Sequence, residues 1–217
     1  LPMRTPYYLG IPSAGSRSPL SSLKEGIRYV WKGERVIFQF IVLGIVPNVI
    51  LQPVLFLLPV FTAEVLRSGA DVGGYLLATT GFGGLISALT IASGGLNKRR
   101  GLVCLWAVTL SSFCAVLFAH SPWLGVAVIL MGLFSFAQGT YRTTSGSVIQ
   151  LLVPDALRGR VTSLQGYGRG FLILSSLLIG WLVDLTTVTI ALTAVGALGL
   201  SLAILATLTL RRVRQLQ

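Results

Sequence analysis

Two pairs of polar side chains lie inside long apolar stretches of the sequence, and in each pair a glutamine precedes an arginine by four residues. Gln138 precedes Arg142, and Gln165 precedes Arg169. Residues four apart share one face of a helix, so each pair would place an amide one turn from a positive charge. Because an ionisable residue within a membrane span is costly, each arginine is by default a functional hypothesis. The chemistry on offer is electrostatic binding of an anionic molecule.

The two arginines differ in their expected depth. Arg142 lies about ten residues inside its stretch, near the midplane, whereas Arg169 lies about eight residues, or about 12 Å, from its boundary, where a side chain can snorkel to water. A further polar pair, Asn48 and Gln52, lies one turn apart near the middle of the first apolar stretch. The alternative is structural, with each arginine capping carbonyl groups or pairing with an acid in another part of the protein.

The elements that must position these side chains are membrane-spanning helices. Hydrophobic residues make up 53% of the chain and charged residues 11%, against about 45–50% and about 25% in soluble domains. Backbone groups in lipid must be satisfied within the segment, so stretches of this length favour helices. The sequence therefore predicts an all-α membrane protein, a bundle of six transmembrane helices, in which Pro47, Pro53 and Pro59 kink the first. The six predicted spans are 36–61, 72–96, 102–119, 123–152, 161–185 and 188–210.

The formal net charge of +11 is explained by topology. Except for Arg67, Arg142 and Arg169, every basic residue falls before the first span, in the second or fourth connection, or in the tail. Basic connections stay in the cytoplasm, so both termini are expected there, in a multi-pass protein of the cell (inner) membrane. Nucleic acid is not an expected partner, because the basic clusters carry no interleaved aromatic residues. The expected organisation is a cytoplasmic loop at 1–20, an amphipathic surface helix at 21–35, a transmembrane domain at 36–210 and a basic tail at 211–217.

The sequence contains no pattern typical of an enzyme, a metal site or a cofactor site, so none of the three is expected. Cys104 and Cys114 are ten residues apart in one span, about 15 Å along a helix, which is too far for a disulfide. The second span carries small residues at a spacing that predicts close approach of a neighbouring helix. They are Gly74, Ala78, Gly81, Gly84, Ala88 and Ala92.

Two predicted cytoplasmic turns carry more specific patterns. Residues 94–101 read Gly-Gly-Leu-Asn-Lys-Arg-Arg-Gly, and residues 150–161 read Gln-Leu-Leu-Val-Pro-Asp-Ala-Leu-Arg-Gly-Arg-Val. Their charges could latch the cytoplasmic side of the protein, or they could serve only to fix topology. The candidate latch residues are Asn97, Lys98, Arg99, Arg100, Asp155, Arg158 and Arg160.

These turns, together with residues 23–30, resemble the carboxyl-terminal half of major facilitator transporters, in the subgroup of enterobactin exporters and transmembrane secretion effectors; Asn97 stands where that family usually has an acid. The resemblance implies a six-helix half that works with a missing amino-terminal six-helix half. It also implies that spans one, four and five line a substrate cavity. The implied function is export of a siderophore or similar small molecule. The alternatives are multidrug or macrolide efflux, or a non-transporting membrane protein. Because Leu1 is not a usual initiator residue, the chain is expected to be a fragment.

Overall fold

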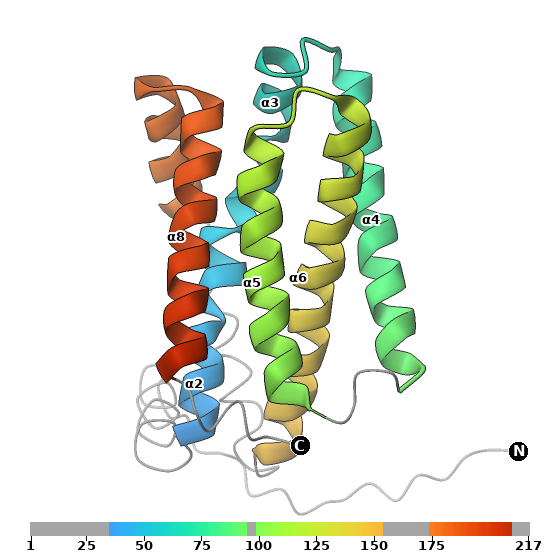
Figure 1. Ribbon diagram of the computed structural model, residues 1–217, viewed down its shortest axis with the longest axis vertical. Coiled ribbons are helices and arrows are strands. Elements are labelled where there is room, and N and C mark those ends of the chain that lie inside the picture. The colour runs from blue at the N-terminus through green and yellow to red at the C-terminus, as the bar shows by residue number, and fades with distance from the viewer. Residues whose placement is uncertain (1–34, 95–98, 154–173, 210–217) are drawn as a thin grey trace, which may run out of the picture.

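The computed structural model describes residues 35–94, 99–153 and 174–209, and within these ranges every regular element is a helix (Figure 1). The all-α fold expected from the sequence is confirmed. The elements in chain order are α2 (Arg35–Leu43), a π-helix (Val46–Ile50), a 3-10 helix (Gln52–Leu55), α3 (Leu58–Glu64), α4 (Ala70–Ala92), α5 (Arg100–Ala119), α6 (Leu124–Leu152), a helix at Leu174–Leu185 and α8 (Val188–Thr209).

Four of these helices are long and apolar enough to cross a membrane: α4, α5, α6 and α8. Their bounds agree with predicted spans two, three, four and six to within a few residues. The first predicted span corresponds to the bent pair formed by Gln39–Leu55 and Leu58–Glu64. Of the fifth predicted span, 161–185, only the helix Leu174–Leu185 lies within the described residues.

The first span is bent by 47° between its two parts. A proline removes a backbone N–H and crowds the preceding turn, so it kinks a helix interior. Pro47 lies in the π-helix, Pro53 in the 3-10 helix and Pro59 in the first turn of α3. The predicted bending of the first span is therefore confirmed as one bend, which lies between Leu55 and Leu58 and is flanked by Pro53 and Pro59.

Helix α6 is central to the described bundle. It packs against α4 on one side and α5 on another, and α5 in turn packs against α8 (Figure 1). The α5–α8 contact is close because two glycines of α8 lie against α5. A Cβ on Gly196 would lie 2.9 Å from the backbone nitrogen of Val116, and one on Gly199 would lie 3.0 Å from the Ser112 hydroxyl oxygen. Cys104 and Cys114 are both buried in α5 and unbridged, as expected from their spacing.

The small residues that bring α4 onto α6 are different from those expected. Gly83 and Ser87 face α6, where a Cβ on Gly83 would meet the backbone of Gly132 and Phe136. Of the expected set, Gly84 lies at this contact, but the other five residues are exposed along a separate face of α4. The predicted close approach is confirmed for this helix at Gly84, and the face formed by the other five residues is exposed in the described part of the chain. Spacing alone leaves open which of two small-residue faces meets the neighbour.

Candidate functional site

The half of α6 that ends at Leu152 presents a polar face. Arg142, Thr143, Ser147 and Gln150 are exposed on it, and Gln138 is half-buried at its outer end. An α-helix advances about 100° per residue, so the four exposed positions lie within an arc of about 140°, and Gln138 lies about 40° beyond Arg142, at the edge of that arc. An exposed polar face on a helix of this length and apolarity is unsuited to lipid. It therefore indicates water or another part of the protein at this position.

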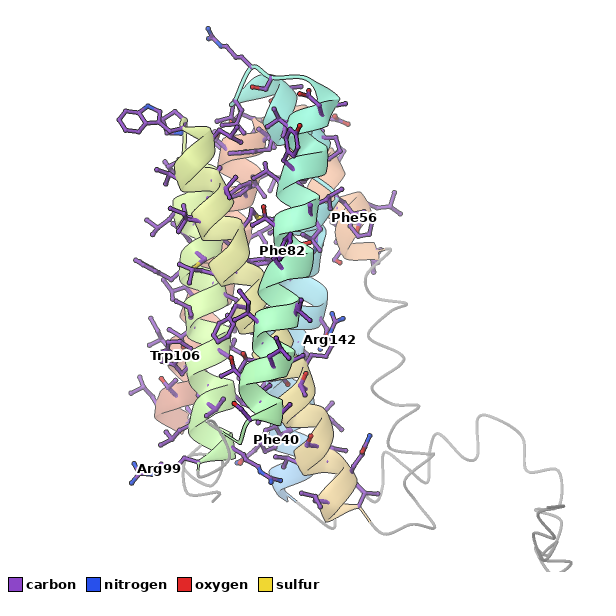
Figure 2. All side chains as sticks on the ribbon, turned by 90° about the vertical axis from the view of Figure 1, so that its right-hand side faces the viewer. Phe40, Phe56, Phe82, Arg99, Trp106 and Arg142 are labelled. Atoms are coloured by element: carbon purple, nitrogen blue, oxygen red, sulfur yellow. The ribbon has the colours of Figure 1, made fainter. Side chains whose placement is uncertain are left out.

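Helices α2 and α4 lie on either side of this face. The hydroxyl of Tyr141 donates a hydrogen bond of 2.9 Å to the carbonyl oxygen of Phe40 on α2. On the other side, the hydroxyl oxygens of Thr140 and Ser87 on α4 are 3.0 Å apart. Arg142 follows these two residues on the arc between the two contacts, and its side chain extends outward between α4 and α2 in Figure 2.

Gln138 lies one turn outward from Arg142 on the same face. Its side-chain Nε2 is buried and has no hydrogen-bond partner in the structure. A buried donor without a partner costs about 1–3 kcal/mol, and each such group in a native protein calls for an explanation. Gln138 and Arg142 thus lie one turn apart on α6, and the Nε2 group of Gln138 is a buried donor without a hydrogen-bond partner.

Asn48 lies in the π-helix of the first span and is exposed. Its side-chain Nδ2 donates a hydrogen bond of 2.9 Å to the carbonyl oxygen of Gly44. Gly44 itself faces α6, since a Cβ there would lie 3.0 Å from the Tyr141 hydroxyl oxygen. Helices α2 and α6 run antiparallel (Figure 1). One turn from Gly44 and from Tyr141 toward the α5–α6 connection leads to Asn48 and Gln138, which therefore lie at similar depth. Gln52, the predicted partner of Asn48, lies in the 3-10 helix that follows.

The candidate latch is described only in part. Arg99 is exposed directly before α5 and Arg100 is the first residue of that helix, at the end of the bundle opposite the α5–α6 connection (Figure 2). The other candidates lie outside the described residues, as does the second glutamine–arginine pair. These are Asn97, Lys98, Asp155, Arg158, Arg160, Gln165 and Arg169.

Charge is sparse within the described helices. The acids in the described ranges, Glu64, Asp71 and Asp184, are all exposed near helix ends. Of the charged residues in those ranges, only Arg142 lies in the middle of a long helix. The described residues contain no cluster of His, Cys, Asp or Glu able to hold a metal ion. The arrangement can therefore bind through a positive charge and amide groups, and within the described ranges it contains no constellation for covalent chemistry.

Sequence reasoning missed two residues that flank this site and one further buried polar group on α2. Tyr141 and Ser87 make the contacts on either side of Arg142, and Gln39 on α2 has a buried Oε1 without a partner. Gln39 could have been found, because it is a polar residue in a predicted span, as are Asn48 and Gln138. The contacts of Tyr141 and Ser87 depend on which helices become neighbours, and no local pattern reports that.

Comparison with known proteins adds two findings. Residues 5–174 match the sequence profile of the Major Facilitator Superfamily, which covers well over half of the chain. The chain is also similar to the protein named "Multidrug efflux pump Tap" from Mycolicibacterium fortuitum, with 27% identity over 148 residues. That alignment covers 68% of this chain and 36% of the relative, so the chain spans only about a third of the relative's length.

Proposed function

The chain belongs to the Major Facilitator Superfamily, and from that premise we propose that it is part of a secondary transporter that exports a small molecule by alternating access. The observation that carries the proposal is the position of Arg142. It occupies the middle of a membrane-spanning helix and extends between α2 and α4, on a face that also carries Gln138. A charge placed there is costly unless it serves a wet cavity or a partner.

The cavity in this proposal has a polar lining of three described residues. Arg142 supplies positive charge, and Gln138 and Asn48 supply amide groups at similar depth on the two neighbouring helices. Gln52, Gln165 and Arg169 complete the proposed lining. The unpartnered Nε2 of Gln138 supports this assignment, because a substrate oxygen or a water molecule could accept its hydrogen bond.

The substrate class follows from the charge. A guanidinium near the middle of the membrane favours an anionic or catechol-bearing molecule, and the turn at 150–161 resembles that of siderophore exporters. We therefore propose export of a siderophore or similar molecule. Multidrug or macrolide-type efflux is the second candidate, and the similarity to a protein named as a multidrug efflux pump favours it.

The transporter also needs a second bundle. Alternating access requires two halves that rock against each other around a central site, and the described helices form only one bundle. We propose that these six spans, residues 36–210, pair with an amino-terminal six-helix half. Both termini lie in the cytoplasm in this arrangement, with the surface helix at 21–35 and the tail at 211–217 on that side. The charged turns around Arg99 and Arg158 would latch the two halves there.

The experiment that tests this function is a comparison of two cargoes in cells that lack their own exporters and express the full-length protein. We expect cells that express the protein to release more catecholate siderophore into the medium than cells without it. Lower macrolide accumulation in the cells, without siderophore release, would favour the second candidate. Transport of neither cargo by a well-expressed, membrane-inserted protein would contradict both.

A further inference from the structure

Helix α5 leaves one narrow part of its surface uncovered. It packs against α6 and α8, and more than half of its residues are buried. The exposed side chains within Arg100–Ala119 are Trp106, Phe113 and Leu117. Because an α-helix advances about 100° per residue, these three positions lie within about 40° of one another. They form a single row of bulky apolar side chains, which we call the α5 row.

A positive charge lies at one end of the α5 row. Arg99, directly before α5, is exposed and precedes Trp106 by seven residues. Seven residues make about two turns, so the two residues lie on the same side of α5, about 10 Å apart along its axis. Figure 2 shows both on one side of the bundle. A guanidinium, an indole and a phenyl ring therefore follow one another along α5.

The described acids lie far from Arg99. Glu64 ends α3 and Asp71 is in the first turn of α4, so both are at the end of the bundle opposite to Arg99. Asp184 is at that opposite end as well, because α8, which follows it, begins where α5 finishes (Figure 1). An anion beside Arg99 would therefore meet no nearby carboxylate among the described residues.

The length of this arrangement matches one leaflet of a bilayer. Arg99 and Phe113 are separated by fourteen residues, or about 21 Å of helix. Half of a bilayer, including its headgroups, is about 20–22 Å thick. An indole suits the level between headgroup and hydrocarbon. Charge, amphipathic ring and apolar ring thus occur in the order of the phosphate, glycerol and acyl chains of a phospholipid.

The α5 row suits lipid better than a neighbouring helix. Helices that pack in a membrane approach each other through small residues, and α8 meets α5 in this way at Gly196 and Gly199. The α5 row carries no small residue. Exposed small residues occur instead on α4, among them Gly74 and Gly81. A second copy of the chain, or another bundle, would therefore fit α4 better than the α5 row.

We propose that Arg99 and the α5 row bind one anionic phospholipid, with its headgroup at Arg99 and its acyl chains along Trp106 and Phe113. An arginine binds a phosphate group through two parallel hydrogen bonds. A headgroup with a net negative charge is preferred over a zwitterionic one, whose ammonium offsets the phosphate. In this arrangement Arg99 faces lipid, and the proposed latch rests on the other charged residues.

The test is quenching of Trp106 fluorescence by brominated phospholipids. The full-length protein, with Trp106 as its single tryptophan, is placed in nanodiscs that contain an increasing fraction of brominated phosphatidylglycerol or brominated phosphatidylcholine. We expect phosphatidylglycerol to reach half-maximal quenching at an about fivefold lower fraction, the effect of one arginine near a membrane surface. Arg99→Gln should remove this difference, and Arg99→Lys should keep most of it.

Arg67→Gln is the matched control. Arg67 is an exposed arginine at the opposite end of the bundle, close in the chain to Glu64 and Asp71. Its replacement should leave the preference for phosphatidylglycerol at Trp106 unchanged. A loss of the preference in Arg67→Gln equal to that in Arg99→Gln would show that overall charge, and not a site at Arg99, attracts the lipid.

Three further outcomes would overturn the proposal. Equal quenching by the two lipids before any arginine is replaced would show that the site does not select a negative charge. Quenching by neither lipid would show that protein covers the α5 row. A preference that survives Arg99→Gln would place the headgroup on another basic residue. None of these readings depends on a cargo, so a failure here is distinguishable from a failure of the proposed export function.

Discussion

The hydroxyl oxygens of Ser87 and Thr140 lie 3.0 Å apart in the buried contact between α4 and α6, two residues before Arg142. The Thr140 hydroxyl also donates to the Phe136 carbonyl at 2.8 Å. A hydroxyl has one proton to give, so Ser87 must be the donor in the bond between the helices. This bond holds α4 against α6 beside the polar face that carries Arg142.

The Ser87–Thr140 bond is expected to contribute modestly to stability. Hydrogen bonds between membrane helices average about 0.6 kcal/mol in double-mutant cycles. A cycle of Ser87→Ala, Thr140→Val and the double variant should therefore give a coupling free energy of about 0.5–1 kcal/mol. Reversible unfolding of the full-length protein in mixed micelles measures it. Strictly additive effects would show that the two hydroxyls do not interact.

Gly83 is expected to be intolerant of any larger side chain. A Cβ there would meet the backbone of Gly132 and Phe136, which cannot move aside without separating α4 from α6. Gly83→Val should lower the free energy of unfolding by at least about 1–3 kcal/mol. Gly81→Val is the matched control on the same helix, because nothing lies within 4 Å of a Cβ at Gly81. Equal losses in the two variants would contradict the observed α4–α6 contact.

Gly44 and Tyr141 are expected to be coupled. A Cβ at Gly44 would lie 3.0 Å from the Tyr141 hydroxyl oxygen, which is tighter than ordinary contact. Gly44→Ala should therefore destabilise the protein by about 1–3 kcal/mol. Adding Tyr141→Phe removes the crowded oxygen, so the double variant should lose less than the sum of the single losses. If thermal unfolding shows that the double variant loses as much stability as the two single variants together, or more, the two sites act separately.

The proposed topology predicts opposite access for the two ends of the described bundle. His120 is exposed at the end of α5 that leads into α6, and Arg99 is exposed at the other end of α5. After Cys104 and Cys114, both buried, are replaced by serine, the single cysteine of His120→Cys should react with a membrane-impermeant maleimide in intact cells. The single cysteine of Arg99→Cys should react only after the membrane is opened, because basic turns are retained in the cytoplasm. The reverse pattern would place both termini outside.

The sequence alone predicts the helical elements of this protein well, because apolar stretches of this length have few other structures available in a membrane. The bounds of α5 and α6 differ from the expected spans by at most two residues. The bend of the first span could also be predicted, since proline acts locally through its missing N–H. The π- and 3-10 turns into which the bend resolves could not.

The candidate site could be predicted only one helix at a time. Gln138 and Arg142 share a face of α6 because four residues make about one turn, and this follows from spacing. The arc on which they lie is defined by the Tyr141–Phe40 contact, which joins residues 101 positions apart in the chain. Similarly, Gly83 contacts α6 and Gly81 does not, although both are glycines in the same small-residue stretch of α4. Contacts of this kind depend on tertiary packing, which sequence periodicity does not report.

The most direct test of the central claim is export by the full-length protein carrying Arg142→Gln. The substitution removes the positive charge and keeps a polar amide on a shorter side chain. Arg67→Gln is the matched control, because Arg67 is an exposed arginine between α3 and α4. At equal expression and equal thermal stability, we predict that Arg142→Gln lowers catecholate export at least about tenfold, the effect of one charge-assisted contact, while Arg67→Gln exports normally. Normal export by a well-folded Arg142→Gln protein would contradict the assignment of Arg142 to the substrate cavity.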